Sequence, residues 1–344
     1  MEIFMIAVLT VLALYKAQLC GKKRRNEEYL SLQQAGYIKG IFAIYIVFHH
    51  VSQFCTGSGL RYGFWNTGYL AVAVFFFLSG YGLLYNVTAS ENYLKGFLKK
   101  RVLKILVPFL VVYFIYIIVD YFEGIRYSAM DIFESFFNGA PIAANLWYVL
   151  FILLYYIVFY IIALAVGAKR KWGIIVFSFL FLVAWCVFCF RKNFGGVWSI
   201  SGFGITVGML FAACKEKIEK LFDRAYFVFV ILFTVAFFAV QHVATRVYTV
   251  FGGWSLKVAM SLLFTLAVIT LLYRIRIGNT ILKFFGTISF ELYMIHGVFL
   301  KLLRGNHIYI NSDIMFLVFV MLASVLSALV LHKVFHTYRN LFRK

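Results

Sequence analysis

Two histidines and a lysine lie in a single apolar stretch, KGIFAIYIVFHH, which runs from Lys39 to His50. About three helical turns separate Lys39 from His50, so on a helix they share one face, about 16 Å apart along the axis. His49 would point about 100° away from His50, which predicts a different role for it. A neutral imidazole is a natural general base for an alcohol nucleophile. The pattern therefore favours His50 as a base and Lys39 as a supporting cation, over a snorkelling lysine and a structural histidine.

A second polar group lies in ISFELYMIH, residues 288–296. Ser289 and His296 are close to one face of a helix, where His296 would either bind an acceptor or act as a structural partner. Ser289 has no base at hydrogen-bond spacing in its own helix, so we expect it to pack and bond to the backbone rather than carry an acyl group. Glu291 faces elsewhere and should pair with a buried cation or amide, for which Lys39 is one candidate.

The elements that must position these residues are membrane helices. Hydrophobic residues make up 64% of the 344 residues and charged residues only 13%, and the mean hydropathy is +0.91. This composition is typical of an all-α, polytopic transmembrane helix bundle, and the apolar runs are too long and continuous for a β-barrel. We expect about eleven spans of bilayer length, near residues 2–19, 36–54, 68–88, 105–122, 145–166, 172–190, 196–213, 225–243, 254–272, 285–303 and 314–334.

The net charge of +20 comes from basic clusters between these spans. Alternation of the loops places the clusters on one side of the membrane, and the positive-inside bias makes that side cytoplasmic. The chain is thus predicted to be a multi-pass plasma-membrane protein in contact with lipid, with its N-terminus outside, its C-terminus cytoplasmic and no nucleic acid as partner. Residues 1–21 would form an extra N-terminal helix before a membrane domain over 22–344 without a soluble appendage. The clusters are Lys22–Arg25, Lys95–Lys104, Lys169–Lys171, Lys215–Arg224, Arg274–Lys283 and the C-terminal tail.

Four stretches, in this order along the chain, resemble the acyltransferase-3 family of integral membrane acyltransferases. KGIFAIYIVFHH is similar to the opening helix of that family, although Lys39 stands where the family more often has arginine, and lysine lacks the planar fork. FFFLSGYGL at 75–83 is similar to its FFxLSG segment. The run Arg101–Pro108 looks like its basic-then-proline helix start, and residues 288–296 look like its late S-Y-x-x-Y-L-x-H signature.

The resemblance implies a ten-helix core that moves an acyl group, most often acetyl, from cytoplasmic acyl-CoA to a hydroxyl of an extracytoplasmic glycan or lipid-linked sugar. Arg101 and Lys104 are neighbours on a helix surface and by themselves suggest attraction to anionic lipid. With the resemblance, contact with the phosphates of coenzyme A is the better interpretation. Because His50 lies in the outer half of its helix, donor and acceptor could meet across the bilayer. Trp147 is expected in an interfacial aromatic belt or along the acyl path.

Two other classes of protein fit parts of the pattern. A secondary transporter or flippase for a lipid-linked or anionic solute would use Lys39, His50 and Glu291 as ligands, but the sequence has no inverted repeat. A scaffold subunit without activity is the third, and a homo-oligomer is compatible with all three. The sequence lacks nucleotide and zinc-protease motifs, and Cys186 and Cys189 lie inside an apolar span, so no metal or nucleotide cofactor is predicted.

Overall fold

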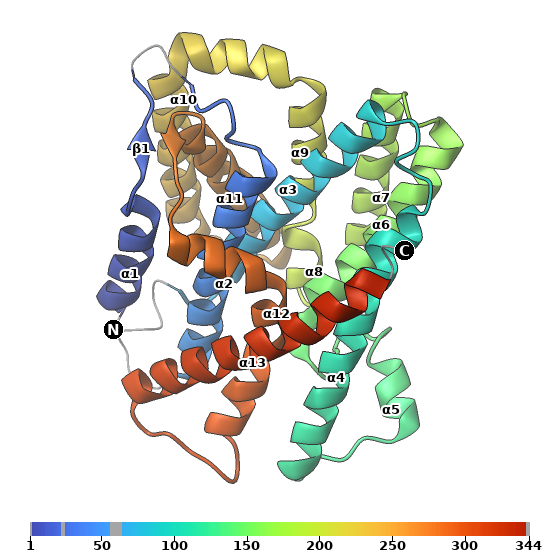
Figure 1. Ribbon diagram of the computed structural model, residues 1–344, viewed down its shortest axis with the longest axis vertical. Helices are drawn as coiled ribbons and strands as arrows, with labels where there is room; N and C mark the ends of the chain where they lie inside the picture. The colour runs from blue at the N-terminus through green and yellow to red at the C-terminus, as the bar shows by residue number, and fades with distance from the viewer. Residues whose placement is uncertain (1, 22–24, 56–63, 342–344) are drawn as a thin grey trace.

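The computed structural model describes residues 2–21, 25–55 and 64–341, and it shows a bundle of helices with one small antiparallel sheet (Figure 1). The predicted all-α class is confirmed. The sheet pairs β1 (Gln18–Leu19) with β2 (Ile275–Arg276). The helices are α1 (Glu2–Leu14), α2 (Leu32–Phe54), α3 (Gly68–Ala89), the π-helical turn η1 (Lys99–Leu103), α4 (Lys104–Phe122), α5 (Ala129–Glu134), the 3₁₀ turn η2 (Ala144–Leu146), α6 (Trp147–Val166), α7 (Lys171–Arg191), α8 (Val197–Ile200), α9 (Phe203–Ala213), α10 (Lys215–Ala244), α11 (Val250–Leu272), α12 (Thr280–Leu303) and α13 (Asp313–Leu341).

Within the described residues, eight helices are long and apolar enough to cross a membrane. The helix α2 is long enough but more polar and is not among the eight, and α1 is shorter than its predicted span. The predicted span 196–213 is two helices, α8 and α9, with Ser201 and Gly202 between them. The Ser201 hydroxyl donates to the carbonyl oxygen of Tyr69 at 2.9 Å. The multi-pass bundle is therefore observed, whereas the expected count of ten core helices is not confirmed.

Glycines allow two helix pairs to approach closely. A Cβ atom at Gly80 of α3 would overlap the carbonyl oxygen of Ile205 in α9, as expected for the small residues of the 75–83 segment. A Cβ atom at Gly40 of α2 would lie 2.5 Å from the carbonyl oxygen of Leu282 in α12. The second pair matters for function, because it sets the helix that carries Lys39 and His50 against the helix that carries Ser289 and His296.

One end of the bundle, which we call the basic end, gathers the loops that the sequence predicts to be cytoplasmic; it is the upper end in Figure 1. Arg25 pairs with Glu219 at 3.1 Å, and the Tyr29 hydroxyl donates to the same carboxylate at 3.1 Å. Burial and the Glu219 charge raise the pKa of Tyr29, so it remains a donor at neutral pH. The structure thus joins the first and fourth of the predicted clusters at one end. Lys22–Arg24 and the last three residues lie outside the described part of the chain.

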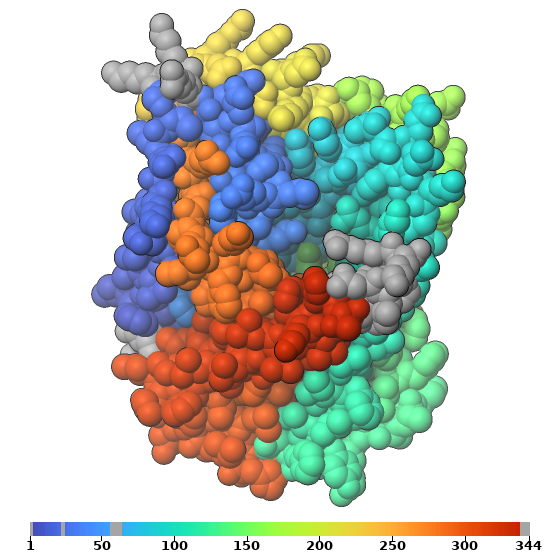
Figure 2. Space-filling model, viewed as in Figure 1, coloured from blue at the N-terminus to red at the C-terminus, as the bar shows by residue number. Residues whose placement is uncertain are grey.

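The last helix, α13, runs obliquely across the face shown in Figure 2, over α12 and toward α4. Its start is held at the opposite end of the bundle, the far end, where Arg304 forms an ion pair with Asp313 and donates to the carbonyl oxygen of Phe54 at the end of α2. These contacts connect α13, the end of α12 and the end of α2. The helix α13 therefore covers the site-bearing pair on one side.

A buried ion pair stabilises the far end of α4 and α12. The Asp120 carboxylate, 1% exposed, accepts from Lys301 Nζ at 2.7 and 2.8 Å and from the Tyr127 hydroxyl at 2.8 Å. We expect Asp120→Ala to cost about 3 kcal/mol of unfolding free energy, because it leaves the Lys301 ammonium without its counter-ion. The measurement is the denaturation midpoint of the detergent-solubilised protein. Glu134→Ala, which removes an exposed carboxylate at the same end, is the matched control and should change stability by less than about 0.5 kcal/mol.

Candidate active site

Three cavities lie along α2 from the basic end to the far end, and residues of α12 also line the second and third of them. The basic-end cavity has a volume of about 460 Å³, the middle cavity about 150 Å³ and the histidine cavity about 340 Å³. Lys39, Ser79 and Tyr156 line both the basic-end and the middle cavity. Tyr293 lines both the middle and the histidine cavity. Consecutive cavities therefore share wall residues and are direct neighbours.

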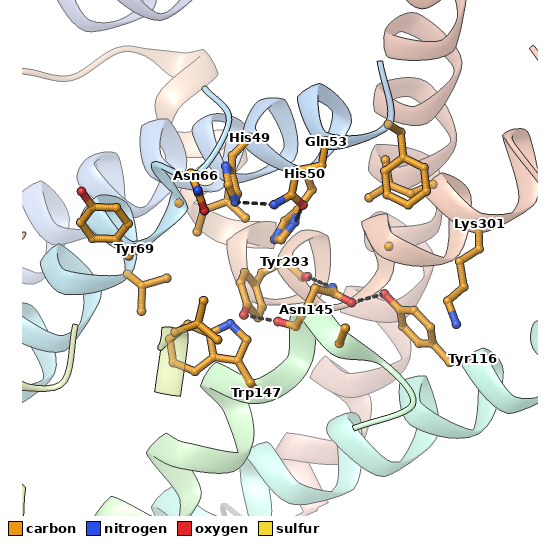
Figure 3. Close-up of a pocket in the computed structure, with 18 residues that line it drawn as sticks. His49, His50, Gln53, Asn66, Tyr69, Tyr116, Asn145, Trp147, Tyr293 and Lys301 are labelled. Carbon is orange, nitrogen blue, oxygen red and sulfur yellow. Dashed lines mark hydrogen bonds between the residues drawn. The ribbon is translucent and has the colours of Figure 1, made fainter. Parts of the chain in front are cut away.

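The histidine cavity is built around a chain of hydrogen bonds along α2 (Figure 3). His49 Nδ1 lies 2.6 Å from the carbonyl oxygen of Phe64. Gln53, one turn further along the helix, places its Nε2 3.4 Å from His49 Nε2 and its Oε1 2.9 Å from His50 Nδ1. Both histidines therefore line one cavity, and they differ in their hydrogen-bond partners, Phe64 for His49 Nδ1 and Gln53 for His50 Nδ1. The Gln53 side chain reaches both rings from the i+4 and i+3 positions.

This chain fixes the tautomer of each neutral imidazole. The Phe64 carbonyl can only accept, so His49 Nδ1 carries the proton and His49 Nε2 is an acceptor. Gln53 must then turn its NH₂ group to His49 and its oxygen to His50, which assigns the proton of His50 to Nδ1. The remaining nitrogen, His50 Nε2, has a lone pair with no hydrogen-bond partner among the residues that the structure describes. A neutral imidazole held in this tautomer is prepared to take a proton from a substrate hydroxyl.

His296 packs beside His50 from α12. Its ring centroid is 5.1 Å from that of His50, and its Nδ1 lies 3.1 Å from the carbonyl oxygen of Leu292. The bond to Leu292 puts the proton on Nδ1, and within the described residues His296 Nε2 is buried without a hydrogen-bond partner. The structure thus brings His50 and His296 together from two helices that are far apart in sequence, although His296 is not among the residues that line the histidine cavity.

Aromatic and amide side chains form the opposite wall of the histidine cavity. The Tyr116 hydroxyl donates to Asn145 Oδ1 at 2.9 Å, and the Tyr293 hydroxyl donates to the Asn145 carbonyl oxygen. Trp147 is buried and lines this cavity, packed 6.0 Å from the ring of Trp198, so it does not belong to an exposed interfacial belt. Figure 3 shows this group across the cavity from the histidines. Flat apolar surfaces next to amides are suited to a sugar ring and its hydroxyls.

The middle cavity is the smallest of the three and is lined by Lys39, Ser79, Ser289 and five aromatic residues. The Ser289 hydroxyl donates to the carbonyl oxygen of Gly286 at 3.0 Å, which is the backbone bond expected of a packing serine. No histidine or carboxylate lines this cavity beside it. The space fits an extended chain with little polarity.

The basic-end cavity holds three cations, Lys39, Arg101 and Lys215, together with Glu27 and Glu28. Arg101 is held by its bond to the Tyr93 hydroxyl at 3.2 Å. Lys104, which the sequence pairs with Arg101, does not line the cavity. Lys215, which our sequence analysis placed only in a basic cluster, does line it. Three converging cations make a site for phosphate groups.

Glu291 is a predicted site residue that, like Lys104 and His296, is not among the residues lining these cavities. Its carboxylate is 1% exposed and lies 3.3 Å from His332 Nδ1 of α13. Glu291 therefore pairs with α13, and a role next to the acceptor has no support in its position.

Comparison with known families decides the class of protein. Residues 34–333 match a family model described as an acyltransferase domain, that of acyltransferase 3. The chain belongs to the acyltransferase-3 family. The match includes α2 from Gln34 onward, with Lys39 and His50, and α13 as far as Lys333, whereas α1 lies before it. No curated protein and no solved structure matches the chain. This member of the family is a membrane acyltransferase, and its helices provide the multi-pass bundle.

Gln53→Leu should lower the turnover number of this acyltransferase about tenfold, the rate equivalent of one hydrogen bond, and leave the KM for acyl-CoA unchanged. The leucine cannot fix the His50 tautomer, whereas Gln53→Glu keeps an oxygen facing His50 Nδ1 and should retain most of the activity. Steady-state kinetics of thiol release measure both parameters. Gln33→Leu, an exposed change on the same helix, is the control. Equal turnover for the two leucine variants would contradict the assignment.

Proposed function

We propose that this acyltransferase moves an acyl group, in the first instance acetyl, from acyl-CoA at the basic end to a hydroxyl of a glycan or lipid-linked sugar at the far end. The observation that carries the proposal is the succession of three cavities from a cluster of cations to a histidine with a free Nε2. The positive-inside bias supports a cytoplasmic basic end, which makes the far end extracytoplasmic.

The donor would enter at the basic end. Arg101 and Lys215 would contact the phosphates of coenzyme A, with Lys39 deeper in the same cavity. The pantetheine arm is long, thin and only moderately polar, so the middle cavity could hold it. This arrangement would present the thioester carbonyl close to Tyr293, where the middle and histidine cavities share a wall.

Acyl transfer then needs one base and no external proton. His50 Nε2 takes the proton of the acceptor hydroxyl while the oxygen attacks the thioester carbonyl carbon. The tetrahedral intermediate collapses with cleavage of the C–S bond, and the ester forms. The coenzyme A thiolate leaves and takes the proton from the His50 imidazolium. While that imidazolium exists, the nearby lone pair of His296 Nε2 would stabilise its charge. His50 is thus base and acid in turn.

The test is the side on which donor and product lie. Sealed right-side-out membrane vesicles would be loaded with radiolabelled acetyl-CoA, and an esterase added outside would release label from any ester on the outer surface. We expect esterase-sensitive label from enclosed donor and none from donor added outside. Vesicles with His50→Ala are the control. Label that is incorporated only on the inner surface would contradict transfer across the bilayer. Solute uptake without consumption of acetyl-CoA would favour a transporter.

A further inference from the structure

A fourth cavity, which we call the side cavity, lies apart from the three described above. It has a volume of about 470 Å³ and lies where the α7–α8 connection meets the α10–α11 connection. Both connections belong to the far end, on the side predicted to be extracytoplasmic. Its polar lining consists of Asn193, Ser199, Thr249, Trp254 and Lys257, and it shares no lining residue with the histidine cavity.

Lys257 is the charged residue of this lining. It lies seven residues into α11, about 10 Å along the helix from its first residue, and within the described residues no ion pair or hydrogen bond to its ammonium group is found. The chain has no acidic residue from 135 to 215 or from 224 to 290, the two stretches that form the side cavity. A cation placed this far into an apolar helix, in a cavity without carboxylates, is suited to an anionic ligand.

The rest of the cavity is apolar. Trp254 lies 5.3 Å from the ring of Phe190 and 5.8 Å from that of Phe251, and its Nε1 donates to the Ser199 hydroxyl at 2.9 Å. Val250 and Phe251, at the start of α11, are 81% and 67% exposed. A ligand in this place would therefore meet one cation, a few hydroxyl and amide groups, and a broad aromatic and aliphatic surface. That combination fits an amphipathic molecule with an anionic head.

The short helix α8 separates the side cavity from the histidine cavity. Val197 of α8 lines the histidine cavity, and Ser199 and Ile200 of the same helix line the side cavity. Ile200 packs in one cluster with Tyr69, whose side chain lines the histidine cavity. A molecule bound at Lys257 thus lies one helix away from His50.

We propose that the side cavity binds the phosphate of a lipid, with Lys257 as its counter-ion and the aromatic cluster of Phe190, Phe251 and Trp254 against its apolar part. Basic pockets between membrane helices bind anionic head groups, and lysine is a common phosphate ligand. Binding itself is independent of acyl transfer. The further step, that the bound lipid is the carrier of the sugar acceptor, rests on the proposed function, since it places the sugar near His50.

The test measures lipid binding to the detergent-solubilised full chain by native mass spectrometry. Dioleoyl phosphatidylglycerol and dioleoyl phosphatidylcholine are added in parallel experiments. Lys257→Gln should weaken the first phosphatidylglycerol about fivefold to tenfold and leave phosphatidylcholine unchanged, as expected for loss of one lysine near a head group. Lys257→Arg should restore binding. Lys192→Gln, which removes an exposed charge outside the lining, is the matched control. Equal weakening by both glutamine variants, or by neither, would overturn the site.

A competition with a polyprenyl phosphate separates the two sources of the phosphate. If the polyprenyl phosphate displaces bound phosphatidylglycerol at a lower concentration than phosphatidylglycerol itself needs to bind, the result supports a carrier of the acceptor. If it does not displace phosphatidylglycerol, the carrier role is overturned while the head-group site stands. Measuring thiol release from acetyl-CoA distinguishes failure of the acyltransferase proposal from failure of the lipid site. If wild-type protein releases no thiol but binds phosphatidylglycerol through Lys257, only the proposed function is wrong. If thiol release depends on His50 but lipid binding does not depend on Lys257, only the lipid site is wrong.

Discussion

Replacement of His50 by alanine should lower acetyl-CoA-dependent ester formation by about 10²–10⁴-fold, the range supplied by a positioned general base. The hydrogen bonds from the Phe64 carbonyl through His49 and Gln53 leave His50 Nε2 as a lone pair for which the described part of the chain offers no donor. Alanine removes that lone pair and leaves the cations of the basic-end cavity untouched. The measurement is free-thiol release and ester formation by purified protein, with acetyl-CoA binding measured separately.

Two further histidine variants make this result specific. His49→Ala removes the hydrogen bond that orients Gln53 but leaves the His50 imidazole in place, so its loss should be closer to tenfold, the rate equivalent of one hydrogen bond. His242→Ala, an exposed change at the end of α10, should have no effect. Loss of thiol release in all three variants would indicate a general loss of folding. Retained activity in His50→Ala, with acetyl-CoA still bound, would rule out the general-base role.

Much of the site could be predicted because it depends on local periodicity. The spacing of Lys39 and His50 fixes their common helix face in any α-helix, and the structure places them in consecutive cavities along that face. Ser289 bonds to its own helix, a contact that depends on a residue three positions away. In each case the partner is set within a few turns of one helix.

The rest depends on contacts between distant segments. The role of His49 follows from the Phe64 carbonyl, which belongs to a connection 15 residues later, and periodicity cannot predict that contact. Lys215 reaches the basic-end cavity only because the start of α10 packs at the same end as α2. Glu291 finds its partner on α13 for the same reason. Gln53 could have been found from sequence, since its spacing from both histidines is that of helix neighbours.

The helix count shows a different limit. The sequence predicts a span over 36–54, and α2 forms there, but α2 carries Lys39, His49, His50 and Gln53 and is not among the eight apolar helices. The break between α8 and α9 lies inside an apolar run, where hydropathy gives no sign of it.

Ser289→Trp should reduce ester formation at the far end to background, the second large effect that the structure predicts. Ser289 lines the middle cavity, whose volume of about 150 Å³ is the smallest of the three, and an indole there would occupy the space proposed for the pantetheine arm. The cations of the basic-end cavity lie outside the blocked region apart from Lys39, so acetyl-CoA should still bind, with its thioester held short of His50. Binding and ester formation are measured on the same preparation.

Ser289→Ala is the matched control, and it also tests covalent catalysis. Its hydroxyl bonds only to the Gly286 carbonyl among the described residues, so its removal should change the rate less than about threefold, the effect of a weak hydrogen bond. If alanine abolished transfer as completely as tryptophan, Ser289 would be an acyl carrier and the direct attack that we propose would be wrong. If neither variant slowed transfer, the acyl group would have to reach His50 by another path. The proposed passage through the middle cavity would then be wrong. Only loss with tryptophan and retention with alanine fits a passage through the middle of the bundle.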